Sequence, residues 1–251
     1  MKQIFLGGLA CCALCASSAF ATLIPIGAVA SSGNGLGAVN SVVTFQNTGL
    51  EVGCVGVDSG GLTVTGASVC AGGVTAPGGV TNEQTGSGNN TYTAANLGLS
   101  PIGATTFANI ILIFNGNEGG GASEPITLDK LSLNLFGSTG TVLGSFSTVA
   151  PYVAAAFPGV GNAGFGFQLD ATQASAANAI LLANPNLRIG ASASASLANS
   201  GPDTVFISRI DTTQPGGGGG GSAVPEPATA GMLGAGLIGL TMILKRRTSR
   251  A

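Results

Sequence analysis

The stretch RIGASASASL, from Arg188 to Leu197, decides the fold because apolar and polar residues alternate through it. Successive side chains of a β-strand point to opposite faces of a sheet. The alternation therefore places Ile189, Ala191, Ala193 and Ala195 on one face and Ser192, Ser194 and Ser196 on the other. We expect the apolar face to pack inward and the serine face to point outward, whereas a helix would need a period of about 3.6 residues.

Other short runs of strand-forming residues lie on both sides of this stretch, separated by Gly, Asn and Ser. Leu131, Leu133 and Leu135 alternate with Lys130, Ser132 and Asn134, which predicts a half-buried strand. The unbroken apolar run 110–114 predicts a strand buried on both faces. The remaining predicted strands are 42–45, 50–57, 62–65, 141–149 and 205–210. Many short strands between frequent turns indicate an all-β fold, an antiparallel β-sandwich over residues 22–211.

Two regions depart from this pattern. Residues 71–104 are poor in aliphatic side chains and are expected to form long loops, with one poor strand near Tyr92. Within them, Asn89-Asn90-Thr91 fits the N-glycosylation pattern, which we interpret as a chance match. Ala171–Ala183 is predicted to be a short crossover helix on the sandwich, capped by Asp170, with Gln173 placed to reach back as in a capping box.

The predicted helix has one apolar face and a clear end. The face consists of Ala174, Ala177, Ile180 and Leu181. Asn184 and Pro185 stop the helix. Phe165-Gly166-Phe167, just before it, is expected to be the end of a core strand rather than a binding surface.

Residues 1–21 have the features of a secretory signal peptide, which would form a short signal helix. Lys2 supplies a positive charge and an apolar core follows to Cys15. Ala19 and Ala21 form a small-x-small cleavage site, so we expect cleavage after Ala21 by signal peptidase, following export by the Sec machinery. The alternative is lipid attachment at Cys11, which would need Leu three positions earlier, where Gly8 stands.

The C-terminal tail, residues 224–251, combines a proline-rich start, an apolar run and a basic end. It begins Val224-Pro225-Glu226-Pro227-Ala228-Thr229, and the prolines hold this backbone extended. Ala228 to Leu244 is 17 residues without a charge, about 25 Å of helix, which is at the short end of what crosses a bilayer. The basic cluster Lys245, Arg246 and Arg247 favours a cytoplasmic C-terminus for this transmembrane helix. The Gly-rich linker 212–223 is expected to be a flexible tether.

This order of motif, helix and basic end resembles the PEP-CTERM sorting signal of Gram-negative bacteria. Val224–Thr229 matches the family's usual VPEPAT opening, and Gly236–Leu240 matches its Gly/Leu-rich helix. The resemblance covers about a tenth of the chain. It implies processing by an exosortase, a membrane transpeptidase similar to cysteine proteases, after a transient stay in the inner membrane. It also implies transfer to the cell surface or the medium, in association with exopolysaccharide and biofilm. The alternative is an ordinary C-terminal anchor after two prolines.

Removal of both ends leaves an acidic, lysine-poor exported part. Between Thr22 and Val224 there are three basic residues, Lys130, Arg188 and Arg209, against nine acidic ones, a formal net charge of −6. Such a balance does not suit nucleic acid or an anionic membrane surface. We therefore expect no nucleic-acid partner, and solubility must rest on Ser, Thr, Asn and Gly.

Two cysteines, Cys54 and Cys70, remain in the exported part and lie sixteen positions apart. In an oxidising compartment such a pair predicts one disulfide. A metal or redox pair is the alternative, but the chain has no histidine and the exported part has no C-x-x-C motif. Closure of the loop is expected to stabilise the fold by about 3 kcal/mol.

The absence of histidine also removes the Ser-His-Asp and Cys-His arrangements and the common His-based metal sites. A carboxylate pair, as in glycosidases, is the remaining enzymatic option, with Glu118 and Glu124 or Asp58 as candidates. Scattered carboxylates on a sheet protein are more simply surface charge, so we expect no catalytic residues. The loops 58–61 and 118–124 lack the alternating acidic ligands of a calcium loop, and Gly72-Gly73 lacks the Lys of a phosphate loop. We expect no metal and no cofactor.

Three functions stay open for the domain. The first is a non-enzymatic cell-surface or matrix protein, with an extracellular polysaccharide as a candidate partner. The second is a carbohydrate-binding module, although the chain has no Trp and only Tyr92 and Tyr152 as tyrosines. The third is a hydrolase, which activity screening of the purified domain would reveal.

Overall fold

The computed structural model describes residues 22–29, 40–84, 88–103, 105–117, 125–154, 164–199 and 201–209. The chain divides into two units, Met1–Pro215 and Gly216–Ala251, and every described residue lies in the first. The predicted signal helix, linker and transmembrane helix thus fall outside the described residues. Within the described ranges, no helix is long and apolar enough to cross a membrane.

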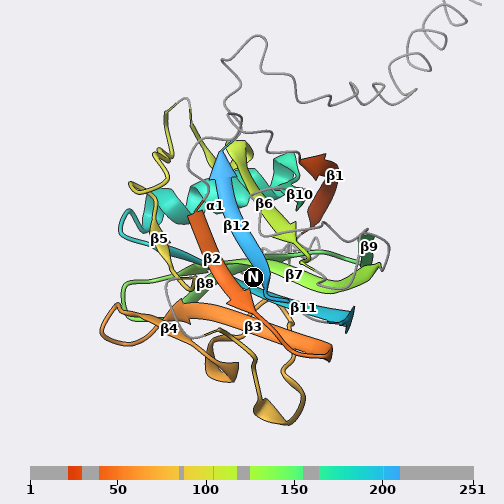
Figure 1. The fold of residues 1–251 in the computed structure, drawn as a ribbon. Coiled ribbons are helices and arrows are strands. Elements are labelled where there is room, and N and C mark those ends of the chain that lie inside the picture. Colours follow the sequence, from red (N-terminus) through yellow and green to blue (C-terminus); the bar gives the residue numbers. More distant parts are fainter. Residues whose placement is uncertain are drawn as a thin grey trace, which may run out of the picture. The chain divides into compact units, whose positions relative to one another are not determined.

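Two antiparallel sheets face each other and form the predicted β-sandwich (Figure 1). The five-stranded sheet has the order β1 (Leu23–Val29), β10 (Gly164–Leu169), β6 (Ile110–Asn115), β12 (Asp203–Arg209) and β2 (Asn40–Phe45). The seven-stranded sheet has the order β4 (Thr63–Thr65), β3 (Gly49–Val57), β11 (Arg188–Ala198), β7 (Ile126–Phe136) and β8 (Val142–Ser147). In the same sheet, β5 (Tyr92–Thr93) pairs with β11, and β9 (Tyr152–Ala154) pairs with β7.

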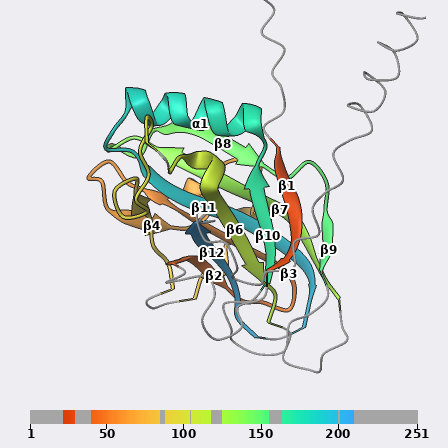
Figure 2. The ribbon, with the colours of Figure 1, turned by 90° about the horizontal axis from the view of Figure 1, so that it is seen from above.

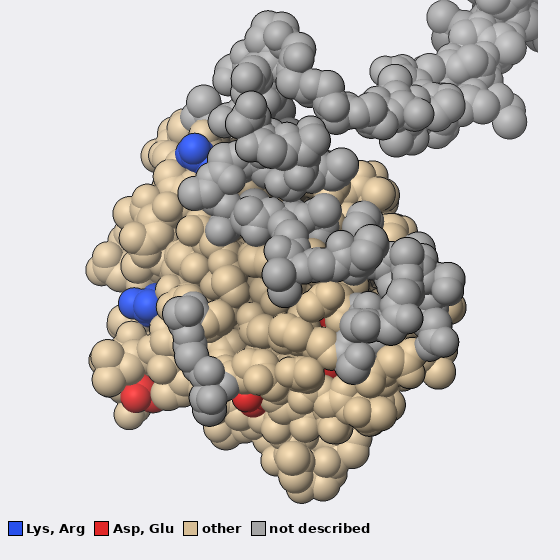
Figure 3. Space-filling view, in the orientation of Figure 1, with Lys and Arg blue, Asp and Glu red and all other residues tan. Residues whose placement is uncertain are grey.

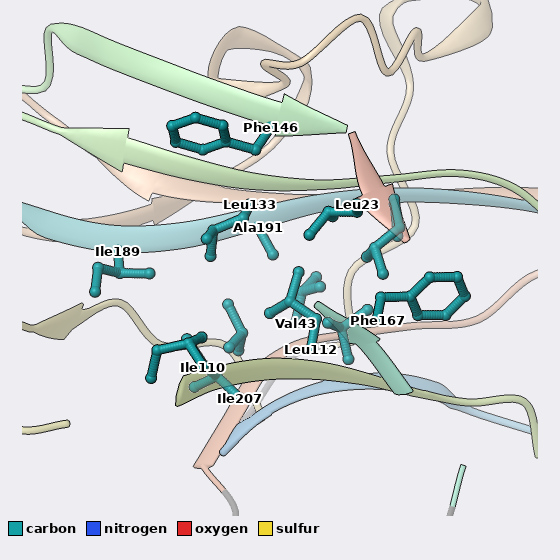
Figure 4. Packing of buried hydrophobic residues seen from close by; sticks show 14 of the residues in the cluster. Leu23, Val43, Ile110, Leu112, Leu133, Phe146, Phe167, Ile189, Ala191 and Ile207 are labelled. Carbon is teal, nitrogen blue, oxygen red and sulfur yellow. The ribbon is translucent and has the colours of Figure 1, made fainter. Parts of the chain in front are cut away.

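Strand β11 lies in the middle of the seven-stranded sheet, between β3 and β7. Its inward residues Ile189, Ala191, Ala193 and Ala195 are fully buried, which confirms the prediction from their spacing. Figure 4 shows Ile189 and Ala191 facing Ile110, Leu112 and Ile207 of the opposite sheet. The small alanines leave room for these larger side chains, so the two sheets share one continuous core.

The prediction that the polar face of β11 and β7 is exposed is wrong. Ser192 of β11 and Ser132 and Asn134 of β7 are fully buried, and Ser194 is only 9% exposed. The middle of these two strands is therefore covered on both faces, whereas Lys130 and Ser196 are partly exposed. The cover is a loop from a distant part of the chain, residues 66–76, which is described with the site below.

Strand β6 is the central strand of the other sheet and is buried along its whole length, as its unbroken apolar sequence predicts. Ile110, Leu112 and Phe114 belong to the core between the sheets. A strand with neighbours on both sides and cover on both faces can carry apolar residues at successive positions. The structure thus explains why no alternation is visible in this stretch.

The helix α1 (Ala171–Ala183) connects β10 of one sheet to β11 of the other, as Figure 2 shows along one side of the sandwich. Asp170 caps it, because its carboxylate accepts from the amide of Gln173 at 2.8 Å. The structure shows this half of the predicted capping box. Three of the four residues of the predicted apolar face, Ala174, Ala177 and Leu181, are buried. The amide side chain of Asn184 ends the helix by donating to the carbonyl of Ile180 at 3.0 Å.

The sequence patterns missed two strands, β1 and β9, and predicted only parts of β7 and β10. Strand β1, with the sequence LIPIGAV, contains Pro25 and a register shift between Pro25 and Gly27, so it shows no clean alternation. Such a strand is confined to a sheet edge, where β1 lies. Strand β9 has only three residues. The segment Phe165–Phe167 is part of β10, as predicted for a core strand, and β10 extends two residues beyond it to Leu169.

The long region 71–104 has little regular structure in its described residues, as expected. It holds η2 (Pro77–Gly79) and β5, the poor strand predicted near Tyr92. Single turns of 3₁₀ helix also lie just outside it, at η1 (Ala67–Val69) and η3 (Phe107–Asn109).

Candidate functional site

The predicted disulfide between Cys54 and Cys70 is present in the structure, with Cα atoms 5.0 Å apart. Cys54 lies on the outer face of β3, and Cys70 belongs to the loop 66–76, which we call the flap. Val52 and Cys54 of β3 form a small second hydrophobic cluster with Val74 of the flap, separate from the main core. The disulfide therefore fastens the flap to the outer face of the seven-stranded sheet.

Under the flap, polar side chains of two neighbouring strands, β7 and β11, form a buried network. The Ser132 hydroxyl donates to the side-chain oxygen Oδ1 of Asn134 at 2.8 Å, and the side-chain nitrogen Nδ2 of Asn134 donates to the Ser192 hydroxyl at 2.8 Å. The flap completes the network, since the Ala71 amide donates to Ser192 at 3.3 Å. Buried polar groups are costly unless they are hydrogen-bonded, so the flap and the polar row of the sheet depend on each other.

Gly72 brings the flap close enough to make these contacts. Its φ is +68°, which favours glycine, and a Cβ at this position would lie 1.9 Å from the Ser132 hydroxyl oxygen. Its carbonyl oxygen accepts from the Ser147 hydroxyl of β8 at 2.7 Å. Gly72-Gly73 is thus a close-packing loop, which gives the pair a role without any phosphate ligand.

Glu83 supports the base of the flap from a neighbouring loop. Its carboxylate oxygen Oε1 accepts from the Cys54 amide at 2.7 Å and from the Gly66 amide at 3.3 Å. The residue before it, Asn82, donates its amide to the Val52 carbonyl at 2.7 Å, and its own carbonyl accepts from the Gln46 amide at 2.9 Å. Because Val52 belongs to β3 and Gln46 follows β2, the segment 82–84 joins the two sheets along one side of the sandwich.

Asn89, the acceptor position of the glycosylation pattern, has a structural role. Its carbonyl oxygen accepts from the Thr44 amide at 2.8 Å, and its amide nitrogen donates to the Gln84 carbonyl at 2.7 Å. The side chain that a glycan would occupy thus holds the loop against the edge of β2.

Tyr92 and Arg188 fasten the next part of the same loop. The Tyr92 hydroxyl donates to the Ser41 carbonyl at 2.8 Å, and burial raises the pKa of Tyr92 above its usual value of 10.0. The Arg188 guanidinium donates to the hydroxyl of Thr91 at 2.8 Å and to its carbonyl at 3.1 Å. One of the few cationic groups of the domain is thus directed to neutral oxygens within the fold.

Two carboxylates are buried, contrary to the interpretation of all the acidic residues as surface charge. Glu51 is 0% exposed and accepts from the Asn47 amide at 3.1 Å. Asp203 is 1% exposed and accepts from the Asn117 amide at 2.7 Å. Both carboxylates accept hydrogen bonds from the backbone of loops at the ends of strands. The alternation of side chains along a strand could have identified both as buried. Glu51 lies on the same face of β3 as the core residue Val55, and Asp203 lies on the same face of β12 as Val205 and Ile207.

The carboxylates considered for catalysis or calcium do not form a described cluster. Asp58 accepts from the amides of Gly60 at 2.8 Å and Leu62 at 2.9 Å, which is ordinary turn chemistry. Glu118 and Glu124 lie outside the described residues. In the ranges that the structure describes, no group of three or more His, Cys, Asp or Glu residues is placed to hold a metal ion.

An aromatic cluster lies beside a small cleft at the edge formed by β1 and β9. The Tyr152 ring packs against Phe165 and Phe167, with ring centroids 5.3 and 5.4 Å apart. The cleft has a volume of about 200 Å³ and is lined by Thr22–Pro25, Thr148–Tyr152 and Phe167. The sequence analysis noted Tyr152 and Phe165–Phe167 separately, because these rings become neighbours only in the folded chain.

The remaining predicted site residues lie outside the described residues. They are the cleavage-site residues Ala19 and Ala21, the motif Val224, Pro225, Glu226, Pro227, Ala228 and Thr229, and the basic cluster Lys245, Arg246 and Arg247. Their assignment rests on the sequence and on comparison with known proteins.

Comparison with known protein families matches residues 223–247 to the PEP-CTERM protein-sorting motif. No curated protein and no solved structure matches the chain, so the sandwich itself brings no relative with a known activity. The matched residues contain the Pro-Glu-Pro motif, the apolar run and the basic cluster in the order noted above. The chain therefore carries a PEP-CTERM sorting signal, the mark of an exported protein that an exosortase processes.

Proposed function

We propose that this protein is a non-enzymatic component of the cell surface or of the extracellular, exopolysaccharide-rich matrix of biofilms. The observation that carries the proposal is the PEP-CTERM sorting motif at residues 223–247. Signal peptidase removes residues 1–21 during Sec export, and the apolar segment after the motif holds the chain in the inner membrane. The exosortase then separates the domain from that segment.

The described domain supports a structural role outside the cell. The Cys54–Cys70 disulfide suits an oxidising compartment. Figure 3 shows one face of the molecule, on which most described atoms belong to neither basic nor acidic residues. A surface of this kind interacts through hydroxyl, amide and apolar groups, which fits a hydrated neutral polymer better than a polyanion.

The carboxylates also support a non-enzymatic domain. The Asp58 carboxylate accepts a hydrogen bond within a turn, and the buried carboxylates of Glu51 and Asp203 accept hydrogen bonds from loop backbone amides. A glycosidase instead needs two carboxyl groups that face a substrate across a few ångströms. Activity screening of the purified domain on polysaccharides and esters tests this point, and turnover of any of them would contradict it.

The sorting step is tested by comparing two strains, one that carries an exosortase and one that lacks it. In the first strain, intact-mass spectrometry should show that the mature protein has lost the segment from about Ala228 onward. Replacement of Pro225, Glu226 and Pro227 by alanine lets the helix extend toward the domain and removes the carboxylate that the exosortase recognises. This variant should keep the segment and accumulate in the inner membrane.

A matched control replaces Thr212, Thr213 and Gln214 by alanine, three changes in the linker that leave the motif intact. The control should be processed like the wild type. A wild-type protein that reaches the surface with its apolar segment still attached would reduce the tail to a plain anchor.

A carbohydrate-binding module is the second candidate function, and one observation favours it. Tyr152 is half-buried beside the cleft of about 200 Å³, where a tyrosine ring can stack on a sugar. A glycan array on the exported domain tests this candidate. Tyr152→Ala should abolish any binding that uses the cleft, whereas Leu182→Ala, a change on the exposed side of α1, should leave it unchanged.

A further inference from the structure

The N-terminal processing site directly adjoins the folded domain. Thr22, the residue after the proposed cleavage site, already bridges Ser147 of β8. Leu23 pairs with Leu169 of β10 and is only 2% exposed. No spacer therefore separates the Ala21–Thr22 bond from the sheet. A peptidase binds its substrate as an unpaired, extended backbone, so a docked β1 would keep Thr22 and Leu23 out of its active site.

Docking of β1 is a late event in the emergence of the chain. Its partners, Ser147 and the strand Gly164–Leu169, follow it by most of the length of the domain. The apolar side of β1 has nothing to pack on until those residues have been exported, because Leu23 belongs to the core shared by both sheets. The chain is therefore accessible at Thr22 while later strands are still emerging.

The C-terminal end has the opposite arrangement. The last strand, β12, ends at Arg209, and 14 residues separate it from Val224. Six of these residues are the glycines Gly216–Gly221. A Gly-rich chain of this length has a root-mean-square span of about 20 Å. The sorting motif can thus enter an active site while every strand of the domain is paired.

We propose that the two processing enzymes act on opposite folding states of this chain. Signal peptidase cleaves it before β1 docks, and the exosortase cleaves the folded domain with its disulfide closed. In the first step water adds across the Ala21–Thr22 amide, which leaves a carboxylate on Ala21 and an amine on Thr22. In the second step the C–N bond of the scissile amide breaks, the acyl group passes to water or to an amine acceptor, and the membrane segment leaves with a free amine at its new N-terminus. This inference rests on the proposed function and adds an order of events to it.

The N-terminal half is tested with the purified, oxidised, full-length precursor in detergent, incubated with signal peptidase. Loss of residues 1–21 is followed by intact mass. A variant with about eight Gly and Ser residues inserted between Ala21 and Thr22 supplies the missing spacer. The native wild type should be cleaved at least about tenfold more slowly than this variant, because cleavage must wait for β1 to open. The same insertion placed after Pro215 is the matched control and should behave like the wild type.

Equal rates for the wild type and the spacer variant would overturn the N-terminal half. If neither the wild type nor the spacer variant loses residues 1–21, either the assigned cleavage site is wrong or another part of the fold shields it. A precursor that ends at residue 140 distinguishes these two explanations. That chain lacks Ser147 and β10, so β1 cannot dock. If it too stays uncleaved, the cleavage site in the proposed function is wrong. If it is cleaved, the assigned site is right and a further part of the fold shields it, which contradicts the spacer argument.

The C-terminal half is tested in cells that carry an exosortase. Deletion of residues 212–221 leaves four residues between Arg209 and Val224, a span of about 10 Å. C-terminal processing of this variant should fall by about tenfold, while its N-terminus is still Thr22. Replacement of residues 212–221 by another Gly/Ser sequence of equal length should restore processing. Undiminished processing of the deletion variant would show that the exosortase acts before the domain folds.

Discussion

The hydroxyl of Ser147 donates a hydrogen bond of 2.7 Å to the carbonyl oxygen of Gly72, and so joins the flap to an edge strand 75 residues further along the chain. The Ala71 amide makes a second contact, to Ser192. Both contacts require the flap backbone to lie directly on the sheet. The residue at position 72 therefore controls whether the polar row of the sheet is covered.

Gly72→Ala should destabilise the domain more than the same change at a comparable glycine. Gly72 and Gly78 have φ values of +68° and +66°, but only at Gly72 would a Cβ meet neighbouring atoms, at 1.9 Å from the Ser132 hydroxyl. Gly78→Ala should cost about 1 kcal/mol for the left-handed conformation. Gly72→Ala should cost about 1–3 kcal/mol more, from overpacking. Urea denaturation measures both, and equal losses would show that the flap does not press on the sheet.

Removal of the disulfide should loosen the flap while the sandwich persists. On the chain-entropy estimate, Cys54→Ser with Cys70→Ser costs about 3 kcal/mol, or about 6–12 °C in melting temperature. Hydrogen exchange at the Ala71 amide should accelerate more than exchange in β6, because few apolar residues other than those of the small cluster hold the flap. Non-reducing mass mapping should first find Cys54 joined to Cys70. Free thiols at both positions in exported protein would contradict the pairing, and export of the variant should be unchanged.

Asp203→Ala should cost more stability than Asp203→Asn. The alanine removes the acceptor of the Asn117 amide, which lies beside a side chain that is 1% exposed, and an unsatisfied buried donor costs about 1–3 kcal/mol. The asparagine can keep an acceptor oxygen at the same place. Chemical denaturation of the two variants at one pH gives the comparison. An identical loss for both would mean that the charge, and not the hydrogen bond, is what matters.

Stability should fall at high pH through Tyr92. Its raised pKa means that the folded state keeps the phenol protonated at pH values where the unfolded chain, with a tyrosine pKa of about 10, has begun to lose the proton. The contribution of this group is therefore constant below about pH 10 and declines as the pH rises above it. Tyr92→Phe should be less stable near pH 8, because it lacks the bond to Ser41, but should show a shallower decline. Denaturation curves at increasing pH measure both effects.

Local pattern was enough to predict the central strands, because their side chains report directly on the faces of a sheet. The alternation of β11, the apolar run of β6 and the Asp170 cap of α1 are all present as expected. The edge strand β1 could not be found in this way. Pro25 and the bulge next to it break the period, and only the pairing with β10 makes the segment a strand.

Burial on the outer face could not be predicted for a different reason. The spacing of Ser132 and Ser192 correctly indicates which face they share, but their exposure depends on residues 66–76, which contact them only in the folded chain. The two cysteines were enough to predict the disulfide, but their spacing in the sequence does not indicate which strands the flap covers. The sorting signal, in contrast, could be predicted from the sequence alone, because a short linear motif is recognised by its residues and needs no tertiary contact.

The segment Asn82–Gln84 has a consequence for contacts between neighbouring copies of the domain. The Gln84 amide donates to the Thr44 carbonyl, the Gln46 amide donates to the Asn82 carbonyl, and the Thr44 amide donates to Asn89. The outer border of β2 is thereby already saturated, and Asn82 does the same for part of β3. Unsaturated strand borders are templates on which neighbouring molecules add strands and grow into fibrils. With this border occupied, β2 has no free edge on which a strand from a neighbouring domain could add.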